Sequence, residues 1–491
     1  MRYRTWILAI SSMLAVPGSM WAQSAVAAVG SPAANPPKTE SAADPGRRDP
    51  AVVAVEHWAL GLSHARLENG LRVVMSVDAQ SPTVAVCVTY DVGSRNETAE
   101  QDGFAHLFEH MMFQGSRNVA KGRHFELVTA RGGSLNGTTS ADRTNYFESL
   151  PTGELDLALW LEADRMRWLN VTRKNFENQR AVVEEEFRMR VTNAAYQPAL
   201  IKLERMVYAG YPPYEHPTIG SMAALEAAKL EWVQKFHERY YVPSNAVISI
   251  VGGFDPDAAM TAVHRYFDQI PSPPPPEYQP PALPPLPTAE RQVELKDANA
   301  KTPALLFGWR IPAAREPDHY PLELVTRILA DGESSVLRQK LVRERALAQD
   351  VSAWTTDHRG PDSLVVTVEL SEHSSVDAVR SVVDRELQRL ATKGPSAAEL
   401  ARAKQRAKSD FVFGLQSNTT KATTLGEYEV FYGDGRLIAR DLEKLLVVTP
   451  ADVASAVRRH LSRNTRSVVT VMPTDAASTT RDAGHSEESQ P

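Results

Sequence analysis

The sequence predicts an α+β fold of two homologous domains, each with helices packed on a largely antiparallel sheet. Three observations support this prediction. The 491 residues are 43% hydrophobic and 23% charged, a globular composition that is long enough for two or three domains. A proline-rich segment at 271–287, PSPPPPEYQPPALPPLP, separates two domain-sized pieces. Both pieces end in an amphipathic helix followed by a β-rich run, at an offset of about 220 residues, which indicates a duplicated domain.

The N-terminus is typical of a cleaved secretory signal. Two arginines precede an apolar run at 6–16, and residues 25–27 read A-V-A, a small-residue cleavage site. The alternative is a membrane anchor, but the run is shorter than the ~20 residues that span a bilayer. We therefore expect a periplasmic or secreted protein with no membrane span after signal cleavage.

The predicted strands and helices follow the same order in both pieces. The first piece opens with LRVVMSV and TVAVCVTYDVG, and the second with TPALLFGWRIP; such β-branched runs favour strands. The proline-rich segment cannot continue a helix or a central strand, which favours a stiff linker over the alternative, a ligand for a recognition module. We expect a signal peptide (1–27), a disordered leader (28–55), a first domain (56–270), a proline-rich linker (271–289), a second homologous domain (290–473) and a disordered tail (474–491).

The charge and cysteine content exclude several classes of function. The 54 Lys and Arg residues stand against 60 Asp and Glu residues, a formal net charge of −6, so there is no basic excess to favour a nucleic-acid partner. Cys87 is the only cysteine, which excludes an intrachain disulfide and a thiolate metal site. Any bound metal must therefore be held by histidines and carboxylates.

The segment DGFAHLFEHMMFQGS at 102–116 carries the chemistry. Its apolar residues predict a buried helix, on which His106 and His110 project from the same face because they are four residues apart. Two imidazoles can then share one metal ion. Glu109 lies next to that face, where it can take a proton from an activated water. This H-x-x-E-H order is the zinc-protease motif H-E-x-x-H in the opposite direction.

The alternative interpretation is a pair of core histidines with a surface glutamate. With 13 histidines in the chain, a chance H-x-x-E-H is expected in roughly 0.02 of such chains. Two histidines and a glutamate would also be costly to bury on an apolar helix without a partner. A metal ion removes that cost, so the segment favours a metal site.

A third ligand is needed, because catalytic zinc usually takes three protein ligands and keeps one position open. The segment NFENQRAVVEEEFRMR offers Glu184, Glu185 and Glu186. Glu186 shares its helix face with two valines at i−4 and i−3 and with Met189 at i+3, so it is the first choice. Glu185 is the second choice, and Glu184 is the least favoured. A solvated helix face explains the two that do not bind.

These motifs resemble the pitrilysin, insulysin and mitochondrial processing peptidase family of zinc peptidases. Glu186 follows His110 by 76 residues (186 − 110) in a V-V-x-x-E context, and residues 132–151 resemble the family's G-G-x-x-N-x-x-T segment. The resemblance covers about residues 60–472. It implies one zinc ion per chain, held by His106, His110 and Glu186 in the first domain, with Glu109 as the general base. It also implies that the chain forms one half of a four-domain clamshell.

The sequence departs from the family at two places. Seven positions before the ligand glutamate the family often has an acidic residue, whereas this chain has Gln179. The family also places an Arg and a Tyr in a partner half, but neither occurs in the expected strand at 363–375. Because the chain resembles half of the clamshell, we expect a second copy, or a homologous subunit without the zinc motif, to complete it. The missing Arg and Tyr favour the homologous subunit.

Together these features predict an exported zinc metallopeptidase that cleaves extended oligopeptides or unfolded segments. An extended peptide would bind by adding a strand to an exposed edge. The candidate edge contains Gly133, Ser134, Leu135 and Asn136; the alternative there is a simple turn. Two other functions remain open: a catalytically inactive zinc-binding or structural subunit of a homologous hetero-oligomer, and a zinc hydrolase of non-peptide esters.

Overall fold

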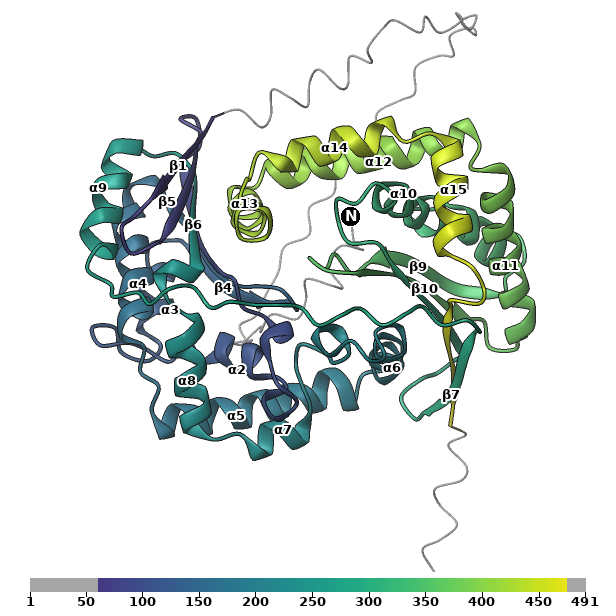
Figure 1. The fold of residues 1–491 in the computed structure, drawn as a ribbon, viewed down its shortest axis with the longest axis horizontal. Coiled ribbons are helices and arrows are strands. Elements are labelled where there is room, and N and C mark those ends of the chain that lie inside the picture. The colour runs from purple at the N-terminus through teal and green to yellow at the C-terminus, as the bar shows by residue number, and fades with distance from the viewer. Residues whose placement is uncertain (1–60, 475–491) are drawn as a thin grey trace, which may run out of the picture.

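The computed structural model describes residues 61–474. The predicted signal peptide, the leader and the tail beyond residue 474 lie outside the described residues. Within 61–474, no helix is both long enough and apolar enough to cross a membrane. Figure 1 shows two separate sheets, each covered by helices.

The two sheets have the same topology. The first has strand order β1-β2-β6-β3-β5-β4 and the second β7-β11-β8-β10-β9. Apart from the added β1, each sheet has one parallel pair (β2 with β6, β7 with β11), and its other pairs are antiparallel. The predicted α+β fold and duplication are therefore confirmed. The strands are Leu62–Arg66, Arg72–Val77, Thr83–Tyr90, Ser134–Thr139, Thr144–Pro151 and Ala246–Gly252 (β1–β6), then Arg291–Asp297, Ala304–Ile311, Ala348–Thr355, Asp362–Leu370 and Ser467–Pro473 (β7–β11).

Helices of the first half run from α2 to α9, and those of the second half from α10 to α15. The first set is Phe104–Met111 (α2), Arg123–Thr129 (α3), Leu155–Trp168 (α4), Arg173–Phe187 (α5), Gln197–Val207 (α6), Met222–Ala227 (α7), Leu230–Tyr240 (α8) and Pro256–Phe267 (α9). The second set is His319–Ala330 (α10), Val376–Lys393 (α11), Ala397–Leu415 (α12), Asn418–Tyr432 (α13), Leu437–Val447 (α14) and Pro450–His460 (α15).

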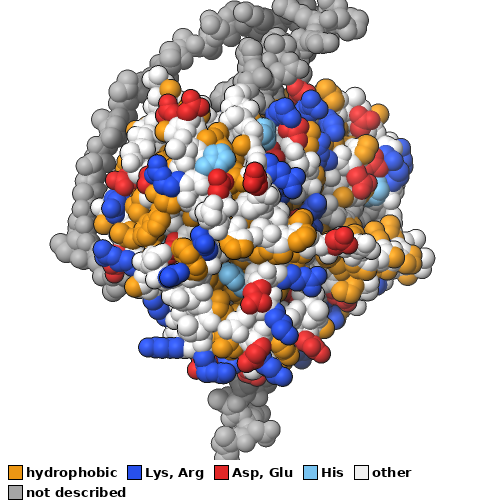
Figure 2. All heavy atoms as spheres, turned by 60° about the vertical axis from the view of Figure 1, so that its left-hand side comes forward, with side chains coloured by type: hydrophobic (Ala, Val, Ile, Leu, Met, Phe, Trp, Pro, Cys, Tyr) orange, Lys and Arg blue, Asp and Glu red, His pale blue; other side chains and the backbone are white. Residues whose placement is uncertain are grey.

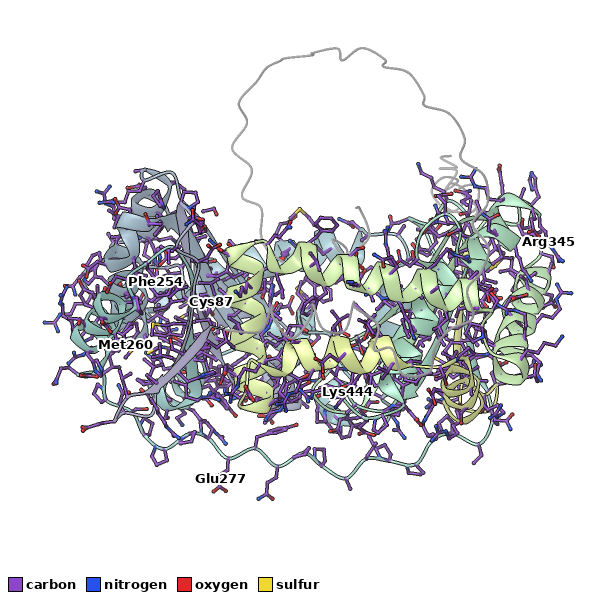
Figure 3. All side chains as sticks on the ribbon, turned by 90° about the horizontal axis from the view of Figure 1, so that it is seen from above. Cys87, Phe254, Met260, Glu277, Arg345 and Lys444 are labelled. Atoms are coloured by element: carbon purple, nitrogen blue, oxygen red, sulfur yellow. The ribbon has the colours of Figure 1, made fainter. Side chains whose placement is uncertain are left out.

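Each half packs one helix on the sheet of the other half. Strand β3 is buried on both faces: Val86 and its neighbours at alternate positions pack in the first-domain core, whereas Ala85 and Cys87 face α13 of the second half. Figure 1 shows α13 beside the first sheet, and Figure 3 shows Cys87 on the side of that sheet where the C-terminal helices lie. In the reciprocal contact, α6 of the first half packs on β8 and β11 through Leu203 and Val207. The halves are therefore held together by apolar cores that belong to both.

A glycine allows the close approach of α13 to the first sheet. A Cβ atom on Gly426 would lie 2.4 Å from Thr89 Oγ1 and 3.1 Å from Ser249 Oγ. Both hydroxyl residues are fully buried in central strands, so they cannot move aside without shifting the sheet.

We expect Gly426→Ala to destabilise the protein by about 1–3 kcal/mol, because the added methyl group overpacks the contact between α13 and the sheet. Gly414→Ala in α12 is the matched control: its Cβ would meet only Thr420 Cγ2, at 3.9 Å, so this change should gain up to about 1 kcal/mol of helix propensity. Urea denaturation of both variants measures the difference. If Gly426→Ala and Gly414→Ala were equally stable, the packing of α13 would not depend on its close approach to the sheet.

The proline-rich segment forms neither helix nor strand at 271–287. Figure 3 shows its trace running along one side of both halves, with Glu277 labelled on it. Arg310 Nη2 donates a hydrogen bond to the Pro284 carbonyl at 2.6 Å, and the Arg95 guanidinium lies 4.7 Å from the centre of the Tyr278 ring. The segment is thus anchored to the second half by one contact and to the first half by the other.

Candidate metal centre

Helix α2 carries both motif histidines into the core of the first domain. All eight of its residues are buried. It begins after Gly103, which adopts a left-handed conformation (φ 94°). The Glu97 carboxylate accepts hydrogen bonds from the backbone N–H groups of Gly103 and Ala105, at 2.8 and 2.6 Å. This carboxylate stabilises the helix N-terminus and fixes the position of the two turns that hold His106 and His110.

The structure brings His106, His110 and Glu186 together. Glu186 Oε2 lies 3.8 Å from His106 Nε2 and 3.1 Å from His110 Nε2. The two imidazole rings are 4.9 Å apart between centroids, at an interplanar angle of 71°. Ligands at about 2.0–2.1 Å from a tetrahedral ion are about 3.3 Å from one another. The three side chains therefore have the spacing of a shared metal ion.

The polar atoms of this group also fit a metal ion. His106 Nε2 and His110 Nε2 are buried and have no hydrogen-bond partner among the described residues. Burial lowers the pKa of His106 to about 3, so its imidazole is neutral at physiological pH, which is the form that binds metal. Unpartnered buried nitrogens are costly, and a cation between them and Glu186 would satisfy both.

Helix α5 presents Glu186 to the histidines, but through a different face from the predicted one. The residues that point inward are Phe176, Gln179, Val183 and Glu186. The predicted companions Val182 and Met189 are 41% and 58% exposed, so that part of the prediction was wrong, although Glu186 is the one of the three glutamates that lies beside the histidines. The inward stripe is half polar because it carries the site. Glu184 and Glu185 instead form ion pairs with Arg180 and Arg188.

The second oxygen of Glu186 is held by Arg190. Arg190 Nε lies 3.1 Å from Glu186 Oε1, four residues away, on the π-helical turn Arg188–Thr192 that follows α5. Burial acts to raise the pKa of Glu186, but His110, His106 and Arg190 outweigh burial and lower it. Glu186 is therefore ionised, with one oxygen directed at the histidines.

Glu109 lies beside the three side chains without joining them. It is 2% exposed, and its Oε2 accepts a hydrogen bond from Thr139 Oγ1 at 2.7 Å. Burial raises the pKa of Glu109 to about 7, against the smaller lowering effect of the Thr139 bond. A carboxylate with a pKa near the working pH is suited to proton transfer. The sequence did not indicate Thr139, because nothing in its local pattern shows which side chain it meets.

The predicted peptide-binding segment is an edge strand of the first sheet. Gly133 immediately precedes β4, which contains Ser134, Leu135 and Asn136 and is paired only with β5. A Cβ atom on Gly137 of this strand would lie 3.1 Å from Glu109 Cγ, so the strand backbone passes directly beside Glu109. The alternative, a simple turn, is wrong. Contact of these four residues with a peptide remains a prediction.

A second buried group resembles a metal site but already contains a cation. His124, Glu148 and Glu162 bring ligand atoms within 4.8 Å of one another. The Arg165 guanidinium donates two hydrogen bonds to Glu162 and lies over the Tyr146 ring. His124 Nε2 is 3.3 Å from Glu148 Oε2. Arg165 already supplies the positive charge that balances Glu162, so we interpret this group as a structural network.

This network predicts a pH-dependent stability. Burial raises the pKa of Glu148 to about 8 from 4.5. Above pH 4.5 the unfolded chain loses this proton and the folded protein keeps it, so stability falls until the pH passes 8. Glu148→Gln removes the titration and can still donate to His124. Between pH 5 and pH 8, the free energy of unfolding of this variant should rise on the order of 2–4 kcal/mol relative to that of the unchanged protein. Urea denaturation measures this difference.

Glu162→Gln is the matched control for that experiment. It leaves the fully buried Arg165 without its charged partner, so it should destabilise the protein by about 3–5 kcal/mol at every pH in this range. If the free energies of unfolding of Glu148→Gln and of the unchanged protein differ by the same amount at pH 5 and at pH 8, the pKa of Glu148 is not raised.

The fold and this site define a class: zinc-dependent peptidases built from duplicated α+β domains. Residues 72–211 match the family model for insulinase (peptidase family M16), and residues 228–407 match the model for the peptidase M16 inactive domain. The chain belongs to the insulinase family, peptidase family M16.

Several of the similar proteins are named as zinc proteases. The chain is 29% identical over 375 residues to the zinc protease PqqE of Helicobacter pylori, covering 74% of this chain and 82% of that protein. It is 28% identical to an uncharacterized zinc protease of Mycobacterium bovis, covering 85% and 94%. Among solved structures, a protease from Helicobacter pylori matches with a TM-score of 0.79 at 26% identity, covering 84% of this chain and 99% of that one.

Proposed function

We propose that this protein is an exported zinc metallopeptidase that hydrolyses peptide bonds in extended oligopeptides or unfolded segments. One observation carries the proposal. Two unpartnered imidazole nitrogens and a carboxylate oxygen converge at metal-ligand spacing, and a second buried carboxylate, that of Glu109, lies beside them on the helix of the two histidines. A purely structural site would have no use for that second carboxylate.

The mechanism assigns one role to each of the four side chains. When bound to His106, His110 and Glu186, zinc supplies Lewis-acid chemistry that polarises the scissile carbonyl and makes a water more acidic. Glu109 takes the proton of the attacking water and delivers it to the leaving amine. Thr139 occupies Oε2 of Glu109, which leaves Oε1 as the atom that holds the proton.

The substrate would bind as an additional strand on β4. The outer edge of β4 carries no partner strand among the described residues, and main-chain hydrogen bonds to such an edge bind a peptide without requiring particular side chains. Because the β4 backbone passes beside Glu109, a peptide paired with Ser134, Leu135 and Asn136 would lie along the metal site. This mode favours extended chains over folded ones.

The cellular setting is also part of the proposal. The arginines, apolar run and A-V-A site at 1–27 support export to the periplasm or beyond.

The chain covers 48% of the periplasmic protease PqqL of Escherichia coli, whose fold it shares at a TM-score of 0.68 and 18% identity. A match to about half of that longer chain supports a clamshell completed by a second copy or a homologous non-zinc subunit. The mass of the native assembly, measured with and without co-expressed neighbours, tests this.

Peptidase assay of the purified protein on a mixed peptide pool tests the activity. We expect internal cleavage of unstructured peptides that is abolished by a chelator and restored by about one equivalent of zinc per chain. A folded protein of the same composition should be cleaved slowly or not at all. Zinc binding without any peptide cleavage would replace the proposal with a non-catalytic zinc-binding subunit, and ester cleavage alone would indicate a different hydrolase.

A further inference from the structure

The turn between β4 and β5 connects the edge strand to the second half of the chain. Arg143 lies in this turn, with only 10% of its side chain exposed. Its Nη1 donates hydrogen bonds to the Thr138 carbonyl and to Thr138 Oγ1, at 3.1 and 2.6 Å. Its Nε donates to Glu427 Oε2 at 3.3 Å. A single guanidinium therefore joins the end of β4 to helix α13.

Glu427 is itself held in a fixed position. It follows Gly426, which lies directly against Thr89 and Ser249 of the first sheet, and its helix packs on that sheet through Ala422 and Leu425. The apolar contact fixes the helix, so the carboxylate meets Arg143 from a rigid element. Because α13 is rigid, Glu427 can hold Arg143, and with it the turn, in a fixed position.

Thr138 and Thr139 are adjacent in a strand, so their side chains point to opposite faces of the sheet. Thr138 faces Arg143 and Asn145, whereas Thr139 donates to Glu109 Oε2. The same short stretch of backbone thus receives the contact from α13 on one face and supports the carboxylate of Glu109 on the other.

We propose that Arg143 and Glu427 are positioning residues, through which the second half of the chain holds the edge strand in register with the metal centre. The inference rests on the proposed peptidase function and deepens it: the second half contributes to catalysis without supplying a group that touches substrate. A displacement of about 1 Å in such a strand can cost about 100-fold in rate.

The test compares Glu427→Gln and Arg143→Met with the unchanged protein, using the full-length chain loaded with zinc. We expect kcat to fall about tenfold to 100-fold in each variant, with KM changed less than about threefold and one zinc retained per chain. The double variant should be no slower than Arg143→Met alone, because both changes break the same link. Hydrogen exchange of the β4 amides should accelerate in both, while that of β3 and β6 stays unchanged.

The matched control is Arg389→Met with Glu399→Gln, a similarly half-buried ion pair at 3.0 Å in the second half, which should leave kcat and β4 exchange unaltered. A kcat for Glu427→Gln equal to that of the control pair, or unchanged β4 exchange, would overturn the inference. Glu427→Gln decides the question alone if Arg143→Met fails to fold. If the protein without substitutions shows no peptidase activity, the proposed function is refuted. The hydrogen exchange of the β4 amides would still show whether α13 holds β4.

Discussion

Glu109→Gln should retain one zinc per chain and lose about 10²–10⁴-fold in kcat. Glutamine is nearly isosteric and can still accept the hydrogen bond from Thr139, so the geometry of the site is preserved. It cannot take a proton from water, and that is the function we assign to Oε1 of Glu109. Steady-state kinetics on a cleaved peptide, together with metal analysis of the same sample, measures both results.

Glu185→Gln provides the matched control for this experiment. Its side chain is 59% exposed and pairs with Arg188 on the surface of α5, so zinc content and kcat should equal those of the unchanged protein. If Glu109→Gln keeps more than about a tenth of the original kcat, the proton must move through another group.

Glu186→Ala should weaken zinc binding at least 100-fold, because even residues that only support a metal ligand contribute about 10–100-fold to affinity. The change removes the only carboxylate among the three candidate ligands and leaves two imidazoles in the core. Competition with a fluorescent chelator measures the affinity, and chelator-treated and zinc-loaded samples should then unfold at nearly the same temperature.

The run of three glutamates supplies its own controls. Glu184→Ala and Glu185→Ala change the same residue type on the same helix, yet their carboxylates pair with Arg180 and Arg188 and not with the histidines. Both variants should bind zinc as tightly as the unchanged protein. A loss of affinity in Glu185→Ala that equals the loss in Glu186→Ala would mean that the ligand had been assigned to the wrong side chain.

The helix of the H-x-x-E-H motif could be predicted because its signal is local. Every residue from Phe104 to Met111 is buried, and four-residue spacing alone places His106 and His110 on one face. The strand order within each sheet was not predicted in detail. The offset between the two pieces nevertheless indicated the duplication, and the matching topologies of the two sheets confirm it.

The inward face of α5 could not be predicted from hydrophobic periodicity. A stripe of Phe176, Gln179, Val183 and Glu186 is half polar, so a search for apolar residues at helical spacing passes over it. Apolar spacing instead favours Val182 and Met189, which are exposed. It still reached Glu186, because Val183 belongs to both stripes. Functional residues weaken the pattern that would otherwise reveal them.

Contacts between distant segments were the other gap. Thr139 with Glu109, and Arg143 with Glu427, join residues 30 and 284 positions apart. Neither pair has a sequence signature, because threonine and arginine are common in turns and strands for many reasons. Such contacts depend on the packing of α13 and β4 on the first sheet, which only the assembled fold defines.

Helix α6 packs on the sheet of the second half, and α13 packs on the sheet of the first half. The two halves should therefore stay together even when the proline-rich segment between them is cut. A protease that cuts between Pro273 and Pro284 would produce two fragments, each with a helix embedded in the other's core. The fragments should therefore migrate as one species on a sizing column and separate only in denaturant. By the same reasoning, neither fragment produced alone would be soluble, because each would expose the sheet surface that its missing helix normally covers.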